Sequence, residues 1–110
     1  MMNPYVLAPG DMTLPIEEGN EQGVFLDYSA TADQKMTITI TSITQYDEAG
    51  AIITVTDATG IPKQYNAQGP VGTAITVDLH AGDIVSVNVY GVDDTFSFKS
   101  CTVSISTVIE

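Results

Sequence analysis

Residues 35–44 read KMTITITSIT, and this stretch decides the fold of the chain. Its apolar residues from Met36 to Ile40 alternate with threonines, so one side of the extended chain is apolar and the other carries hydroxyl groups. Ile43 breaks the alternation, which predicts a β-bulge or a bend near Ser42. The stretch is therefore expected to form a half-buried β-strand that packs one face on a core.

The same period of two recurs along the chain, between short clusters of Gly, Pro, Asn and Asp that favour turns. No window shows the three-to-four spacing of a helix with a capping residue in front of it. Strands are expected at residues 23–29, 35–44, 51–57, 73–79, 83–90 and 96–108, with shorter ones at 5–7, 12–16 and 63–66. A chain of about eight short strands at this spacing is expected to be all-β, a single antiparallel β-sandwich that is jelly-roll-like.

A chain of 110 residues has the length of one domain, but its N-terminal part differs from the rest. Residues 1–22 contain closely spaced prolines and glycines, and Glu17, Glu18 and Glu21 make the segment acidic. Pro15 lacks an amide hydrogen, so it restricts its neighbourhood to an edge strand. We therefore expect an irregular N-terminal arm with one edge strand over residues 1–22, and a β-sandwich domain over residues 23–110.

The charge of the chain is one-sided, since 14 Asp and Glu stand against 3 Lys and Arg and give a formal net charge of −11. Such a chain repels phosphate backbones and anionic headgroups, which argues against nucleic-acid and membrane partners. No apolar stretch approaches the about 20 residues of a membrane-spanning helix, and residues 1–10 lack the regions of a signal peptide. The expected partners are a protein surface or further copies of the chain.

The sequence contains no combination of residues that is typical of a catalytic site. Its single histidine, His80, lies in a turn-like segment, and its single cysteine, Cys101, occupies an apolar position of an alternating run. We expect an exposed turn histidine and a buried thiol, rather than a nucleophile with its base. There is no Gly-x-Ser-x-Gly motif and no phosphate-binding loop. The protein is therefore expected not to be an enzyme and to need no organic cofactor.

Two tyrosines are the candidate ligand-binding residues. Tyr46 and Tyr65 lie near the ends of expected strands, where an exposed ring can stack on a sugar. Packing at a sheet edge is the alternative role for both. Phe25, Phe96 and Phe98 alternate with other residues as core side chains do, and are expected inside the sandwich.

Three acidic residues are the candidate metal ligands. Asp93 and Asp94 are adjacent in an expected loop, and Glu17 could join them from the N-terminal segment. Calcium takes six to eight oxygen ligands from carboxylates and loop carbonyls, so this set suits a structural calcium ion. Solvated loop acids without a metal are the alternative.

Three segments resemble a known family. They are residues 23–33 with 36–40 (GVFLDYSATAD and MTITI), residues 53–60 (ITVTDATG) and residues 79–89 (LHAGDIVSVNV). These segments look like bacterial pre-peptidase C-terminal domains and related cell-surface sandwiches, over roughly residues 23–108. The resemblance implies an extracellular, non-enzymatic, jelly-roll-like sandwich that binds polysaccharide or protein and in some members calcium. It also implies that Asp57, Gly60, Gly82 and Asp83 form turns.

Two functions remain open at this point. The first is a structural or interaction module that assembles on a larger surface, such as a phage virion decoration or fibre-base protein. The second is an extracellular carbohydrate-binding or adhesion module of a bacterial cell-surface protein, with polysaccharide as its partner. The expected location is accordingly a virion or the extracellular surface.

Overall fold

The computed structural model describes residues 5–93 and 97–110, and within these ranges the chain forms nine β-strands and no helix. The described residues accordingly contain no helix that could cross a membrane. The strands are β1 (Tyr5–Val6), β2 (Gly10–Ile16), β3 (Val24–Ser29), β4 (Gln34–Ile43), β5 (Ala49–Thr56), β6 (Pro62–Gly69), β7 (Ala74–Leu79), β8 (Ile84–Gly91) and β9 (Cys101–Ile109).

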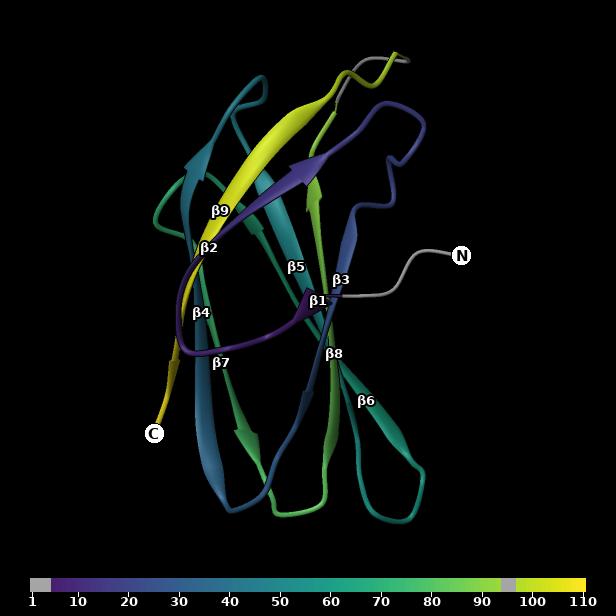
Figure 1. The fold of residues 1–110 in the computed structure, drawn as a ribbon, viewed down its shortest axis with the longest axis vertical. Helices are drawn as coiled ribbons and strands as arrows, with labels where there is room; N and C mark the ends of the chain where they lie inside the picture. Colours follow the sequence, from purple (N-terminus) through teal and green to yellow (C-terminus); the bar gives the residue numbers. More distant parts are fainter. Residues whose placement is uncertain (1–4, 94–96) are drawn as a thin grey trace.

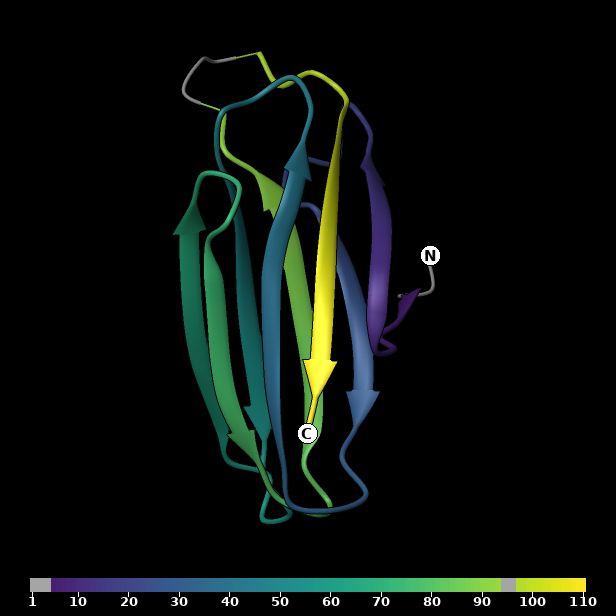
Figure 2. The ribbon, with the colours of Figure 1, turned by 90° about the vertical axis from the view of Figure 1, so that its left-hand side faces the viewer.

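The strands form two sheets, and Figure 2 shows the four-stranded sheet in front of the five-stranded one. The orders are β2-β9-β4-β7 and β1-β3-β8-β5-β6. β1 joins β3 in parallel, whereas the antiparallel pairs β2–β9, β3–β8, β4–β7 and β5–β6 are nested like one long hairpin wound into two facing sheets. This is the jelly-roll arrangement, so the expected fold class is confirmed.

Side chains that alternate along the strands fill the space between the sheets. In β4, Met36, Ile38 and Ile40 are at most 2% exposed, while the threonines between them lie on the opposite, outer side. The register of β4 against β9 shifts between Ile40 and Ser42, which confirms the irregularity predicted near Ser42. Removal of such an apolar layer from water is the main stabilising term of a sandwich.

Within the described residues 5–22, the N-terminal segment is not an irregular arm, and here the structure corrects the expected boundary at residue 22. Leu14 and Ile16 are fully buried and Leu7 is 2% exposed, so all three belong to the core. β2 is an edge strand of the four-stranded sheet, with Pro15 opposite Thr102. The edge strand expected around Pro15 is therefore present, but as a part of the jelly roll that closes one side of the core.

The C-terminal strand and one phenylalanine also differ from expectation. β9 begins at Cys101, because residues 97–100 belong to the preceding connection. Phe96 lies outside the described residues, and Phe98 is half-buried against the core. Phe25 was expected inside but is 44% exposed, because it shares the outward side of β3 with Asp27.

The four residues implied as turn formers do lie in turns. Gly60 and Gly82 have φ angles of 88° and 95°, which favour glycine. The Asp57 carboxylate accepts hydrogen bonds from the Thr59 and Ile61 amides, and the Asp83 carboxylate accepts one from the His80 amide at 2.8 Å. These short turns hold the end of the sandwich that is lowest in Figure 1.

Candidate functional site

Three connections between strands meet at the opposite end of the sandwich, the upper end in Figure 1. They are residues 17–23 between β2 and β3, residues 44–48 between β4 and β5, and the described parts of the β8–β9 connection, residues 92–93 and 97–100. We call this surface the loop end. Loops that a rigid sandwich holds in place are a common location for binding residues.

Tyr46 ties two of these connections together. Its hydroxyl accepts a hydrogen bond from the Lys99 amide at 2.7 Å and donates one to the Lys99 carbonyl oxygen at 3.3 Å. Its ring centroid lies 5.5 Å from that of Phe98. A Cβ atom at Gly91 would come within 2.9 Å of the Cys101 sulfur and 3.3 Å of the Tyr46 ring, so the glycine leaves room for both. Tyr46 therefore has a packing role, whether or not it also contacts a ligand.

Gln45 precedes Tyr46 in a strained turn. Its φ is 72°, and it is the only non-glycine residue with positive φ in the described part of the chain. The Tyr46 amide donates a hydrogen bond to the Thr44 carbonyl oxygen at 2.8 Å, across Gln45. A bond from residue i+2 to residue i across a positive φ defines a γ-turn, which is rare and strained. The turn therefore lies between the end of β4 and the connection residues Tyr46, Asp47 and Glu48.

Further backbone bonds fix the other connections. The Glu18 amide donates to the Ser100 hydroxyl at 3.0 Å, which joins the β2–β3 and β8–β9 connections. The Val92 amide donates to the Glu48 carbonyl oxygen at 3.0 Å, which joins the β4–β5 and β8–β9 connections. The loop end is therefore a set of mutually bonded loops rather than three independent ones.

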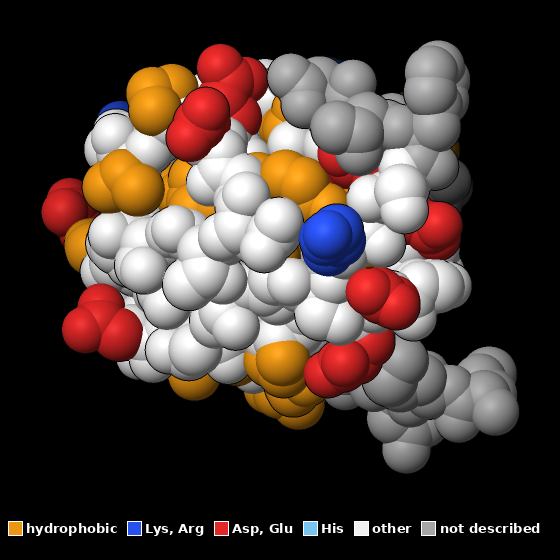
Figure 3. Space-filling model, turned by 90° about the horizontal axis from the view of Figure 1, so that it is seen from above, with side chains coloured by type: hydrophobic (Ala, Val, Ile, Leu, Met, Phe, Trp, Pro, Cys, Tyr) orange, Lys and Arg blue, Asp and Glu red, His pale blue; other side chains and the backbone are white. Residues whose placement is uncertain are grey.

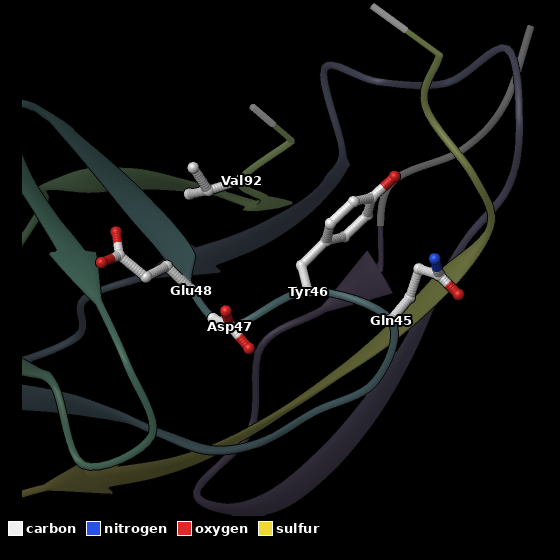
Figure 4. A pocket seen from close by; sticks show the side chains of 5 residues that line it. All are labelled: Gln45, Tyr46, Asp47, Glu48 and Val92. Atoms are coloured by element: carbon white, nitrogen blue, oxygen red, sulfur yellow. The ribbon is translucent and has the colours of Figure 1, made fainter. Parts of the chain in front are cut away.

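A hollow of about 340 Å³ lies at the loop end, lined by Gln45, Tyr46, Asp47, Glu48 and Val92. Figure 4 shows the Tyr46 ring and the Glu48 side chain pointing away from one another, on either side of Asp47. Asp47 and Glu48 are both exposed. In the view from above, acidic side chains stand around this end, with a lysine among them (Figure 3). The hollow therefore presents carboxylates to solvent.

The structure gathers some of the sequence-predicted site residues and separates others. Glu17 and Asp93 both belong to loop-end connections, whereas Asp94 lies outside the described residues. No three His, Cys, Asp or Glu residues of residues 5–93 and 97–110 form a group that could hold a metal ion. Calcium binding therefore stays a prediction. Tyr65 lies in β6, the edge strand of the five-stranded sheet, and does not line the hollow.

His80 and Cys101 lie near opposite ends of the sandwich. His80 is exposed in the β7–β8 turn, and Cys101 opens β9 next to the loop end and is 6% exposed. Burial raises the pKa of the Cys101 thiol. The two side chains therefore do not form a nucleophile and base pair, and the buried thiol expected from the sequence is confirmed.

No family model and no curated protein matches this chain. Solved structures with a similar arrangement include "Xyl-CBM35 in complex with glucuronic acid containing disaccharide", with 17% identity and a TM-score of 0.48, covering 81% of this chain and 70% of that one. Another is the globular domain of zebrafish complement 1qA protein, with 7% identity and a TM-score of 0.46, covering 92% and 97%. At these sequence identities and TM-scores, the two similar structures do not assign a function to this chain. Its function is therefore inferred from the geometry of its own surface.

Proposed function

We propose that this protein is a non-enzymatic interaction module that assembles onto a basic protein surface through its loop end, in the manner of a virion decoration or fibre-base protein. The observation that carries this proposal is the hollow in which Asp47 and Glu48 stand exposed on mutually bonded loops. The proposed location is correspondingly a virion or the extracellular surface.

Preorganisation supports the loop end as the binding surface. Because the connections already bond to one another through Tyr46, Glu18 and Val92, little conformational freedom remains to be lost on binding. A ligand surface therefore meets a shape that is already formed. This favours recognition of a defined partner over loose ionic attraction.

Charge supports a basic partner. The formal net charge of −11 and the carboxylates of the loop end attract a surface that carries Lys or Arg, and repel other copies of the same surface. Complementary charge of this kind steers association and excludes wrong partners. The partner is therefore expected to contact the loop end with basic side chains.

Carbodiimide cross-linking tests this proposal, because the reagent joins a carboxylate to an amine only where the two are in contact. The experiment uses the protein isolated in its assembled state from its native source, with mass spectrometry to locate the linked residues. Links from Asp47 or Glu48 to partner lysines are expected. Links that arise instead from Asp11 and Glu110, or recovery of the protein only as a free monomer, would contradict the proposal.

A second function, carbohydrate binding, is supported by a different surface. The outer face of the five-stranded sheet is almost free of charge and carries aromatic and carboxamide side chains. A structural calcium ion would belong to this second function. If the protein binds calcium, addition of calcium chloride is expected to raise its melting temperature, and EDTA is expected to reverse the rise.

A further inference from the structure

Six side chains on the outer face of the five-stranded sheet are either aromatic or carry a carboxamide group. The residues between the buried positions of β3, β8, β5 and β6 point away from the core. They include two aromatic residues and four carboxamides, which together we call the amide face: Phe25, Tyr90, Asn88, Gln64, Asn66 and Gln68. Strand pairing aligns Phe25, Asn88 and Asn66 in one row across the sheet, with Ile52 between the two asparagines.

Tyr90 lies across the neighbouring strand in the next row. A Cβ atom built on Gly50 of β5 would be 2.3 Å from both Cζ and the hydroxyl oxygen of Tyr90, so the ring occupies the space above this glycine. The hydroxyl then reaches β6, where it donates a hydrogen bond to Gln68 Oε1 at 3.1 Å. The ring therefore spans three strands, is supported from below by backbone, and is only partly buried.

Charge is nearly absent from this face. Asp27 is the one charged residue among the outward positions of β3, β5, β6 and β8, in a chain whose formal net charge is −11. A basic protein or a charged polymer would therefore find little electrostatic complement here. Carboxamide and hydroxyl groups instead offer both donors and acceptors to a neutral polar ligand.

Phe25 adds a second aromatic side chain on the same face. It is 44% exposed and lies directly opposite Asn88, which is two residues from Tyr90 on β8. The Asn88 amide donates to the carbonyl oxygens of Gln22 and Val24 at 2.7 and 3.2 Å, so its position is fixed. The fixed Asn88 carboxamide therefore has one aromatic neighbour across the sheet, Phe25 on β3, and a second aromatic residue, Tyr90, two positions along β8.

We propose that the amide face binds a neutral polysaccharide chain, with Tyr90 as the stacking platform and Phe25, Asn66 and Gln68 as flanking contacts. Sugar rings present an apolar C–H face that packs on an aromatic ring and a rim of hydroxyl groups that pair with carboxamides. The inference deepens the second proposed function and is independent of the loop end. Its occupant is a neutral glycan rather than a protein or a second copy of the chain.

Affinity electrophoresis tests this proposal, in native gels that contain xylan, glucomannan or a mixed-linkage β-glucan, with polygalacturonate as the charged comparison. We expect at least one neutral polysaccharide to retard the protein and polygalacturonate not to. The Tyr90→Ala variant is expected to lose at least roughly tenfold in affinity, the scale of loss for truncation of a central aromatic contact. Tyr90→Phe keeps the ring and is expected to stay within about threefold of the wild type.

Tyr65→Ala is the matched control, because it removes a 39% exposed tyrosine that points to the other side of β6. This control variant should leave the retardation of the protein in the gel unchanged.

If Tyr90→Ala fails to fold, the Asn66→Ala, Gln68→Ala double variant takes its place, since both side chains are exposed. Any of three results overturns the proposal: no retardation by any neutral polysaccharide, equal loss with Tyr65→Ala, or a dimer that depends on Tyr90. Loss of retardation in Asp47→Asn, Glu48→Gln with retention in Tyr90→Ala would move glycan binding to the loop end and also overturn it.

Discussion

Thr107 carries a hydroxyl group that the core does not satisfy. The residue is 2% exposed, and Thr107 Oγ1 has no hydrogen-bond partner among the described residues. Thr107→Val replaces the hydroxyl with a methyl group of similar size, so we expect the free energy of unfolding to rise by about 1 kcal/mol. Urea denaturation measures it, with Thr39→Val on the outer side of β4 as a control. A loss of stability in Thr107→Val would show that the hydroxyl is satisfied in solution.

Substitutions at Gln45 test whether the backbone of the loop end is strained at this residue. A positive φ costs a residue with a Cβ atom about 1–2 kcal/mol, and more for a β-branched one. We expect Gln45→Val to lower the free energy of unfolding by at least about 1 kcal/mol, and Gln45→Gly to leave it unchanged or raise it. Thermal unfolding of the two variants side by side checks this. Equal stability of the valine and glycine variants would mean that the γ-turn is not kept in solution.

Asp57 gives the fold a defined dependence on pH. Hydrogen bonds from the Thr59 hydroxyl and then from the Ile61 amide hold the pKa of Asp57 below its ordinary value of 3.8. A lowered folded pKa means that the stabilisation is complete above pH 3.8 and is lost as the pH falls through the folded pKa. We expect the wild type to melt higher than Asp57→Asn at neutral pH, and the two melting curves to converge in acid. A difference that stays constant down to pH 2.5 would exclude this assignment.

The burial of a single residue could be predicted from the sequence only in strands where apolar residues occupy one side and polar residues the other. Cys101 alternates with Val103 and Ile105, and all three are buried. In β3 apolar residues occur on both sides of the strand, so the alternation does not show that Phe25 faces outward. Its parity with Asp27 was the available signal. The position of Tyr90 above Gly50 depends on the pairing of two residues that are 40 positions apart in the sequence, which no local pattern contains.

At the scale of elements, β2 closes the core from the edge of the four-stranded sheet. Prolines and glycines are typical of an irregular arm, but Pro15 is equally compatible with an edge strand. The buried side chains of Leu14 and Ile16 decide between the two, because they alternate with exposed residues over β2. Composition alone could not distinguish an arm from an edge strand, since it does not show which side chains pack against the opposite sheet.

Leu14→Ala is the direct test of β2 as a core strand. Removal of a fully buried leucine side chain costs about 2–5 kcal/mol, so a marked drop in the free energy of unfolding is expected. Thr13→Ala, at the exposed neighbouring position, loses one hydrogen bond to Ser104 and should cost less than about 1 kcal/mol. If both variants were as stable as the wild type, residues 1–22 would be an arm after all. Guanidinium denaturation resolves differences of this size.

At the scale of the whole molecule, the jelly roll separates two surfaces of different character. The loop end is acidic and is built from connections of both sheets, whereas the amide face is almost uncharged and is built from strands of one sheet. The sequence could predict the fold class and the excess of acid, because both follow from local pattern and composition. It could not predict the hollow, which depends on how the β4–β5 and β8–β9 connections bond to one another in space.

Co-sedimentation with the native assembly tests the central claim, that the loop end is the docking surface. The Asp47→Asn, Glu48→Gln variant and the Asp11→Asn, Glu110→Gln variant change the net charge equally, and all four side chains are exposed. We expect the first variant to lose at least roughly tenfold in affinity for the assembly and the second to bind as the wild type does. Equal binding by both variants, or equal loss in both, would contradict the loop end as the docking surface.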